Sequence, residues 1–239
     1  MRVLITGAGL IGTHTAKELI ERGDDLTFFD FAPKPDYIRR VTDRDVAVIR
    51  GDIRDIAALV DAFQQTRAEC VVHLAASVGE ANITNVYAGF QVNLVGTINV
   101  VEAARRAGVR RLVHASTQAL YVSEDSTELL SENSPTDSRE RVYNAAKLAC
   151  EHVLRTYAAK RKIELALLRF AGVYGYYAVA GGPGVAVQQA VWDALAGKPV
   201  TLNVYESVDL VYAKDLANGI ALCIRILCRI RFTISAVAR

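Results

Sequence analysis

The chain has 239 residues, of which 51% are hydrophobic, so it is long enough to bury the core of one large α/β domain. Its 28 Lys and Arg residues against 26 Asp and Glu give a net charge of only +2, which excludes the strong global field that attracts nucleic acid or an anionic membrane. We therefore expect its partners to be small molecules.

Neither a membrane segment nor a secretion signal is predicted. No run approaches the roughly 20 apolar residues that cross a bilayer. The apolar stretch at the N-terminus ends at a glycine turn and not at a small-residue cleavage site. We expect a cytoplasmic protein.

The cysteines and histidines give no signal for a metal or redox site. C-x-x-C spacing and a nearby histidine pattern are absent around Cys70, Cys150, Cys223 and Cys228, which predicts buried thiols, no disulfide and no metal. His73 and His114 lie inside apolar strands, and we interpret them as core residues with hydrogen-bonded ring nitrogens, not as catalytic bases.

The first 50 residues alternate short apolar strands with helices. Val3–Thr6 predicts a strand, and it leads through glycines into Thr13–Arg22, where apolar residues recur at helical spacing. Leu26–Phe29 and Val46–Arg50 predict the second and third strands. The proline-containing segment between them, Phe31–Asp45, is expected to be a loop or a short helix.

The alternation continues to residue 170. Helical spacing predicts helices at Asp55–Thr66, Tyr87–Ala107 and Val142–Ala159. Apolar runs predict strands at Cys70–Leu74, Arg111–Ala115 and Glu164–Phe170. The polar segment Ser123–Arg141 is expected to be an exposed connection. Strands that alternate with helices are typical of a parallel, doubly wound α/β sheet, a Rossmann fold, which we assign to residues 1–170.

Residues 171–239 follow a less regular pattern. Ala171–Gly184 is rich in Gly and Tyr and predicts a flexible loop, followed by a helix at Val185–Ala196. Short strands are expected at Pro199–Leu202 and Val208–Tyr212. Ala213–Arg239 begins with helical spacing but then mixes arginine with apolar residues without a period.

A glycine turn follows the first strand and opens the first helix. Glycines at positions 7, 9 and 12 allow a sharp turn and the close approach of a pyrophosphate, whose charge the helix N-terminus attracts. Ordinary strand–helix turns also contain this pattern, but Asp30 ends the second strand about 20 residues later, as in the dinucleotide fingerprint. We predict dinucleotide binding, with phosphate contacts at Gly7, Gly9, Leu10, Ile11 and Gly12.

Asp30 favours NAD over NADP. Its carboxylate can accept hydrogen bonds from ribose hydroxyls and would repel a 2′-phosphate. Arg39 and Arg40 are an alternative phosphate contact, although we prefer to interpret them as an exposed helical pair. Asp52 and Ile53 follow the third strand and could bind the adenine amino group and ring, but a surface turn explains Asp52 nearly as well.

Tyr143 and Lys147 form a Y-x-x-x-K pair on one face of a predicted helix. A phenol with an ordinary pKa of about 10 is a poor base at neutral pH, whereas a nearby ammonium and an oxidised nicotinamide stabilise phenolate. Amphipathic helices contain such pairs by chance. Together with the glycine turn, the pair indicates a nicotinamide enzyme.

In their order along the chain, these motifs resemble the extended short-chain dehydrogenase/reductase family, specifically its NAD-dependent epimerase/dehydratase group, which acts mostly on nucleotide sugars. The matching residues are the Gly7–Gly12 turn, Asp30, Gly51-Asp52-Ile53, His73-Leu74-Ala75-Ala76, Asn93 with Gly96-Thr97, Ser116-Thr117 with Tyr121, Tyr143 to Lys147, Arg169-Phe170 and Val173-Tyr174-Gly175. The segment 208–217 also resembles the family.

The resemblance implies a role for each matching residue. Tyr143 would be the general acid/base, Lys147 would bind the nicotinamide ribose and lower the pKa of the tyrosine, and Thr117 would donate to the reacting oxygen. Thr117 is preferred to Ser116 because it lies four residues before Tyr121, as in the family. Further NAD contacts are implied at Asp30, Asp52, Ile53, Leu74, Ala75, Ala76, Asn93 and Phe170.

Three departures from the family pattern concern the phosphate turn and the substrate site. The glycine turn is one residue shorter than usual. Val122 and Gly172 stand where the family has Gly and Asn, which puts substrate contacts in question. The chain also ends soon after residues 208–217, so we expect residues 171–239 to form a small, truncated substrate-binding lobe, interleaved with the last part of the core.

The implied function is an NAD-dependent epimerase or dehydratase that acts on a nucleotide sugar by transient hydride transfer to bound NAD. A dehydratase needs an Asp-Glu pair where Gln118 and Ala119 stand, which favours an epimerase or a simple dehydrogenase. The alternatives are a dehydrogenase of a sugar, sugar acid or related alcohol that releases NADH, and a non-catalytic NAD-binding protein. Tyr87–Ala107 and Val142–Ala159 resemble the helices of the family's dimer interface, which implies a homodimer.

Overall fold

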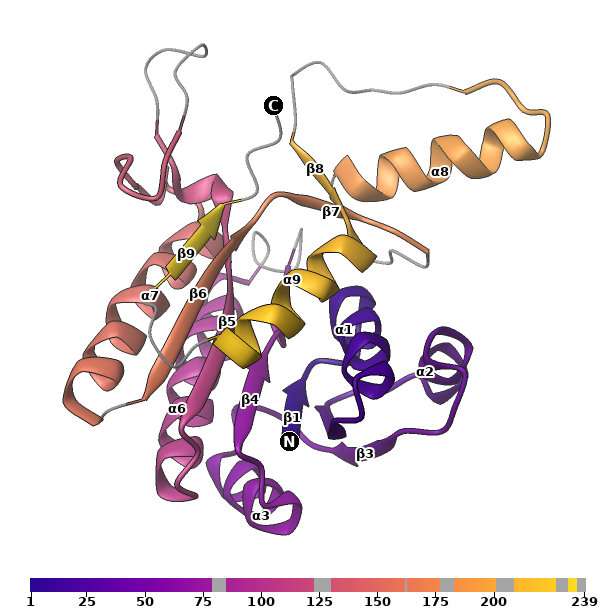
Figure 1. Ribbon diagram of the computed structural model, residues 1–239. Coiled ribbons are helices and arrows are strands. Elements are labelled where there is room, and N and C mark those ends of the chain that lie inside the picture. Colours follow the sequence, from indigo (N-terminus) through magenta and orange to yellow (C-terminus); the bar gives the residue numbers. More distant parts are fainter. Residues whose placement is uncertain are drawn as a thin grey trace.

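The computed structural model describes residues 1–78, 85–122, 130–161, 163–176, 183–200, 209–226 and 232–235. Within them, a parallel seven-stranded sheet has the order β3-β2-β1-β4-β5-β6-β9 (Figure 1). Its strands are β1 Arg2–Thr6, β2 Asp25–Asp30, β3 Ala47–Arg50, β4 Cys70–His73, β5 Arg111–Thr117, β6 Glu164–Phe170 and β9 Phe232–Ser235. The order reverses between β1 and β4, which confirms the predicted doubly wound fold.

Helices cover both faces of the sheet (Figure 1). One layer contains α1 Leu10–Glu21, α2 Pro35–Thr42 and α9 Ala213–Ile226, and the other contains α3 Ile56–Thr66, α6 Gly96–Arg106 and α7 Val142–Arg161. Because successive strand residues point to opposite faces, Ile5 packs in the core beneath α1 and α9, whereas Leu4 packs in the core beneath α3 and α6. The continuous apolar strands of the sequence follow from this double burial.

The prediction of one continuous helix at Tyr87–Ala107 is wrong in the middle of that segment. The structure has α5 Val86–Phe90, a π-helical turn η1 Gln91–Val95 and then α6. A π-helical turn inserts a residue into the helix and is frequent at functional sites. Here it contains Asn93, which is buried. Apolar periodicity alone did not reveal this turn, because the residues on both sides of it keep helical spacing.

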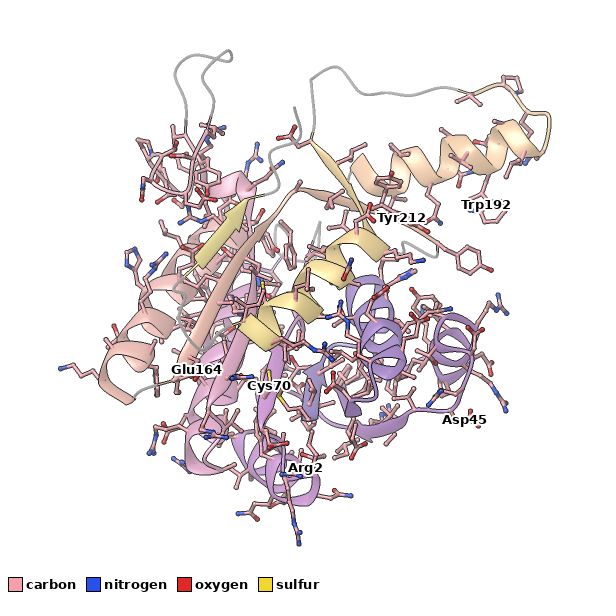
Figure 2. All side chains as sticks on the ribbon, in the orientation of Figure 1. Arg2, Asp45, Cys70, Glu164, Trp192 and Tyr212 are labelled. Atoms are coloured by element: carbon pink, nitrogen blue, oxygen red, sulfur yellow. The ribbon has the colours of Figure 1, made fainter. Side chains whose placement is uncertain are left out.

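The flexible loop predicted at Ala171–Gly184 is wrong for its first part. Gly172–Tyr174 forms β7, which pairs in parallel with β8 Leu210–Tyr212. Helix α8, Pro183–Leu195, follows and carries Trp192 on its exposed side (Figure 2). Residues 199 and 200 form no strand, and the rest of the strand predicted at Pro199–Leu202 lies outside the described residues.

The helical spacing with which Ala213–Arg239 begins corresponds to α9, and the described part of the remainder, which has no period, contains the strand β9. Helix α9 packs along α1, and β9 pairs with β6 as the outermost strand of the sheet. Both therefore belong to the Rossmann core, while β7, β8 and α8 lie beyond the carboxyl ends of the strands (Figure 1). The division of the chain at residue 170 stays a prediction.

The structure also bears on the expectations for the polar connection, for membrane and metal sites, and for the cysteines. Part of the connection predicted at Ser123–Arg141 lies outside the described residues, and Tyr121 and Thr136 near its ends form an antiparallel bridge. Across the described ranges, no helix has the length and apolarity to cross a bilayer, and no three His, Cys, Asp or Glu side chains gather as metal ligands. Cys70, Cys150 and Cys223 have free thiols, the first two buried, and Cys228 is not described.

Candidate active site

A cleft of about 690 Å³ opens at the carboxyl ends of the central strands, where the strand order reverses. Its lining includes every predicted site residue except Asn93: Gly7, Gly9, Leu10, Ile11, Gly12, Asp30, Asp52, Ile53, Leu74, Ala75, Ala76, Thr117, Tyr143, Lys147 and Phe170. Segments separated by more than a hundred residues thus meet in one place, because parallel strands all end at the same edge of the sheet.

The glycine turn is closed on one side and open on the other. A Cβ on Gly12 would lie 2.0 Å from the carbonyl oxygen of Gly7, and Gly7 itself has a φ of +92°. A Cβ on Gly9 would meet nothing within 4 Å. Gly9 is also the N-cap of α1 and offers no side-chain hydrogen bond, so the first amides of α1 remain available to a phosphate.

Asp30 and Asp52 both line the cleft that contains the glycine turn. The carboxylate of Asp30 accepts hydrogen bonds from the amides of Ala8 (2.7 Å) and Ala32 (2.8 Å), which orient it and leave lone pairs for ribose hydroxyls. Asp52 forms an ion pair with Arg54, whose hydrogen bonds lower the pKa of Asp52. Arg39 forms an ion pair with Asp45 at 3.3 Å.

A buried hydrogen-bond network fixes the loop that follows β4. The hydroxyl of Thr97 donates to the carbonyl of Asn93 (2.7 Å), so Nε2 of His73 is the donor in its 2.9 Å bond to Thr97. Nδ1 of His73 then accepts from Thr6 (2.6 Å). The amide of Asn93 binds both the N–H and the carbonyl of Ser77. Asn93 therefore lies behind the cleft and holds the loop that lines it.

His114 corrects one expectation from the sequence. It is buried as predicted, beside His73 with the two rings 5.1 Å apart, but within the described part of the chain neither of its ring nitrogens has a hydrogen-bond partner. Burial, together with Lys147 and His73, holds its pKa well below the ordinary value. Burial and Lys147 likewise lower the pKa of His73 to about 3. At pH 7 we therefore expect both rings to be neutral in the folded protein.

Replacing His114 by Leu is expected to raise the free energy of unfolding at pH 7 by about 1 kcal/mol, because it removes two unpaired buried nitrogens at similar volume. A buried neutral histidine gains a proton on unfolding. Below the ordinary pKa of 6.5 the unfolded state therefore binds more protons than the folded state, so the parent loses stability as the pH falls from 6.5 toward the lowered pKa. Urea unfolding between pH 7 and about 4.5 should show a shallower fall for the variant than for the parent.

His73→Leu is the matched control on the neighbouring strand. Because it leaves the buried hydroxyls of Thr6 and Thr97 without their partner, we expect it to lower the free energy of unfolding at pH 7 by about 2 kcal/mol. If both variants lowered the free energy of unfolding by the same amount, the proposed difference in hydrogen bonding between His73 and His114 would be contradicted.

Tyr143 and Lys147 extend from α7 toward the end of β5. Lys147 is 2% exposed, and its ammonium donates to the carbonyl of Ala115 at 2.7 Å. Burial lowers the pKa of Lys147 to about 8. The ammonium lies 5.6 Å from the centre of the Tyr143 ring. Burial, with Cys150, raises the pKa of the Tyr143 phenol to about 12. The lowering of that pKa by Lys147 together with an oxidised nicotinamide stays a prediction.

Ser116 and Thr117 have different partners. Ser116 is buried and donates to Glu151 at 2.6 Å, which engages its single proton. The hydroxyl oxygen of Thr117 accepts from the amide of Ala119 at 3.2 Å, and no acceptor for its proton is present among the described residues. This arrangement favours Thr117 over Ser116 as a donor to a ligand in the cleft.

The structure adds residues that no sequence motif indicated. Arg54 pairs with Asp52, and Val185 of α8 extends the lining of the cleft. Glu151 joins Ser116 to Arg169 beneath the cleft. The sequence feature that could have identified Glu151 is its position four residues after Lys147, which places both on the same face of α7.

Comparison with known proteins identifies the family. The sequence profile described as "NAD dependent epimerase/dehydratase family" matches residues 3–227. The chain belongs to this family. A crystal structure of Thermus thermophilus UDP-glucose 4-epimerase in complex with NAD has a TM-score of 0.86 and 32% identity, over 98% of this chain and 77% of the other.

Two curated relatives are UDP-glucuronate 4-epimerases. A probable one from Rhizobium meliloti is 32% identical over 92% of this chain and 67% of its own length. UDP-glucuronate 4-epimerase 1 of Arabidopsis thaliana is 30% identical over 91% of this chain and 53% of its own length. The chain thus spans between half and two thirds of these relatives.

The residues of the cleft fit the NAD on which this family depends. The open side of Gly9, the uncapped amides of α1 and the oriented carboxylate of Asp30 provide phosphate and ribose contacts in the order that a dinucleotide requires. Arg39, the alternative contact for a 2′-phosphate, is paired elsewhere.

Proposed function

We propose that this protein is an NAD-dependent epimerase that inverts a hydroxyl-bearing carbon of a UDP-linked sugar. The observation that carries the proposal is that Thr117, Tyr143 and Lys147 line the same cleft as the glycine turn and Asp30. Support for the substrate class comes from the relatives, which are named for UDP-glucose and UDP-glucuronate. Gln118 and Ala119, in place of an acidic pair, favour epimerisation over dehydration.

The proposed residue roles follow from the hydrogen bonds in the cleft. Bound NAD would supply a reversible hydride acceptor for the sugar carbon. As a phenolate, Tyr143 takes the proton of the sugar hydroxyl and later gives it back, while the hydroxyl of Thr117 donates a hydrogen bond to the same oxygen. Lys147, held by the carbonyl of Ala115, binds the nicotinamide ribose and supplies the positive charge that a phenolate needs.

The other NAD contacts are proposed from the lining of the cleft. The glycine turn with Leu10 and Ile11 binds the pyrophosphate, and Asp30 binds the adenosine ribose. Asp52 and Ile53 hold the adenine, whereas Leu74, Ala75, Ala76 and Phe170 form the walls of the site. Asn93 acts indirectly through Ser77.

The test is to incubate the protein and NAD with UDP-glucuronate or UDP-glucose and follow the sugar epimer by proton NMR. An epimerase forms the C4 epimer while the absorbance of reduced nicotinamide stays low, because the hydride returns in each cycle. Steady accumulation of NADH would instead support the dehydrogenase alternative. NAD binding without either reaction, for both sugars, would support a non-catalytic NAD-binding protein.

We also propose a cytoplasmic homodimer that forms through α6 and α7. The exposed side chains of Val86 and Tyr87, at the start of the segment leading into α6, support an apolar contact there. Sedimentation equilibrium tests the assembly, and a monomer at all concentrations would contradict it.

A further inference from the structure

A buried ion pair lies under the proposed catalytic residues. Tyr143, Lys147 and Glu151 follow one another at intervals of four residues, so they share the face of α7 that packs on the sheet. The carboxylate of Glu151 accepts two hydrogen bonds from the guanidinium of Arg169, at 2.9 and 2.7 Å. The side chains of Glu151 and Arg169 are only 3% and 6% exposed. This bidentate contact joins α7 to the end of β6.

The same pair holds the segment that contains Thr117 at both ends. On one side, Ser116 donates to Glu151 at 2.6 Å. On the other side, the guanidinium of Arg169 lies 4.7 Å from the centre of the Tyr121 ring, over its face. Thr117 lies between these two attachments, at the end of β5 and the start of the short turn η2, Gln118–Leu120.

The charges of Glu151 and Arg169 are better explained by a role in positioning neighbouring residues than by a contribution to the stability of the fold. Burial alone would raise the pKa of Glu151, but the hydrogen bonds from Arg169 and Ser116 outweigh burial and hold that pKa below the ordinary value. A well-packed apolar pair would often stabilise a protein equally well. An apolar pair would lack the directional bonds that set the distance from α7 to the ends of β5 and β6.

We propose that Glu151, Arg169 and Ser116 form a positioning clamp that holds Thr117 in register with the face of α7 that carries Tyr143 and Lys147. Glu151 and Arg169 are not part of the lining of the cleft, and Ser116, which is, has its proton engaged by Glu151. In this scheme the clamp acts through the residues that it orients. Its expected effect on turnover rests on the proposed function, whereas its effect on the order of the strand ends does not.

The test replaces both members of the ion pair, Glu151→Leu with Arg169→Met, so that no single charge is left buried. We expect the melting temperature to stay within a few degrees of the parent. Amide hydrogen exchange in residues 115–119 should become about tenfold faster. Turnover of UDP-glucuronate should fall about 100-fold with little change in KM, because misplacement affects the reacting geometry more than binding.

The matched control is the ion pair Arg111–Glu164, which joins the same two strands at their opposite ends with a 2.6 Å contact. Glu164 lies at the start of β6 (Figure 2). Arg111→Met with Glu164→Leu should leave turnover and the exchange of residues 115–119 unchanged. If the clamp variant behaves like this control, the clamp is refuted.

Two other outcomes can still be interpreted: a clamp variant that does not fold, and a parent protein that does not convert the UDP-sugars. If the double clamp variant does not fold, Ser116→Ala removes one hydrogen bond and keeps the ion pair, and turnover should then fall about tenfold. Parent-like exchange and turnover in Ser116→Ala would overturn the clamp. If the parent protein itself does not convert the UDP-sugars, the proposed function fails, and the exchange of residues 115–119 still decides whether the clamp orders the strand ends.

Discussion

Replacing Tyr143 by Phe is expected to lower the rate of epimerisation about 10³-fold while the protein still binds NAD. The change removes one oxygen atom from a side chain that lines the cleft, so the volume of the site is nearly conserved. Lys147 and its bond to the carbonyl of Ala115 remain in place. Loss of turnover would therefore report the loss of proton transfer, not the loss of the site.

The matched control for this prediction is Tyr157→Phe on the same helix. The hydroxyl of Tyr157 donates to Glu102 at 3.3 Å, away from the cleft, so we expect epimerisation within about a factor of two of the parent. Turnover is measured by NMR of the UDP-sugar, and NAD affinity by calorimetry. Full activity of Tyr143→Phe with unchanged NAD affinity would remove the proposed acid/base from the mechanism.

The second large effect is expected at Gly12. A Cβ on Gly12 would lie 2.0 Å from the carbonyl oxygen of Gly7, where backbone and not a flexible side chain must move. Gly12→Ala should therefore distort the turn, cost about 1–3 kcal/mol of stability and weaken NAD binding by about 100-fold through lost phosphate contacts. Calorimetric titration with NAD and urea unfolding measure the two effects.

Substitutions at two other glycines distinguish an effect on packing from an effect on NAD binding. Gly9→Ala places its Cβ in open space, so the protein should keep its stability, but the methyl group would occupy the side from which a pyrophosphate approaches. Gly219→Ala, inside α9 with no atom near its Cβ, should stabilise the protein by about 0.5–1 kcal/mol and leave NAD affinity unchanged. NAD affinity equal to the parent in both Gly9→Ala and Gly12→Ala would exclude this turn as the phosphate site.

Elements with a strong local signal could be predicted from the sequence. Strands β1 to β6 are short apolar runs, and α1 and α3 have clear helical periods, so their residues identify them without knowledge of the fold. The glycine turn and Asp30 lie at the ends of the adjacent strands β1 and β2, so a spacing rule could predict that position. The regular order of these elements also determined the doubly wound topology.

Elements that depend on distant partners escaped prediction. Gly172–Tyr174 is a strand only because Leu210–Tyr212 pairs with it, and Phe232–Ser235 is a strand because β6 accepts it at the sheet edge. The π-helical turn at Asn93 leaves helical spacing intact on both sides, so periodicity did not reveal it. In each case the decisive hydrogen bonds join residues far apart in sequence or change the backbone within a regular pattern.

For the candidate site, too, some features follow from the sequence and others only from the tertiary structure. By itself, the sequence determined the residue types that a dinucleotide and a proton transfer need, because glycine, aspartate, tyrosine and lysine recur there at fixed local spacings. Only the tertiary structure decided which groups retain hydrogen-bonding capacity. It engages Ser116 with Glu151, and among the residues that the structure describes it leaves the proton of Thr117 available and buries His114 without a partner. The physical reason is that hydrogen bonding and desolvation depend on neighbours that only the folded chain brings together.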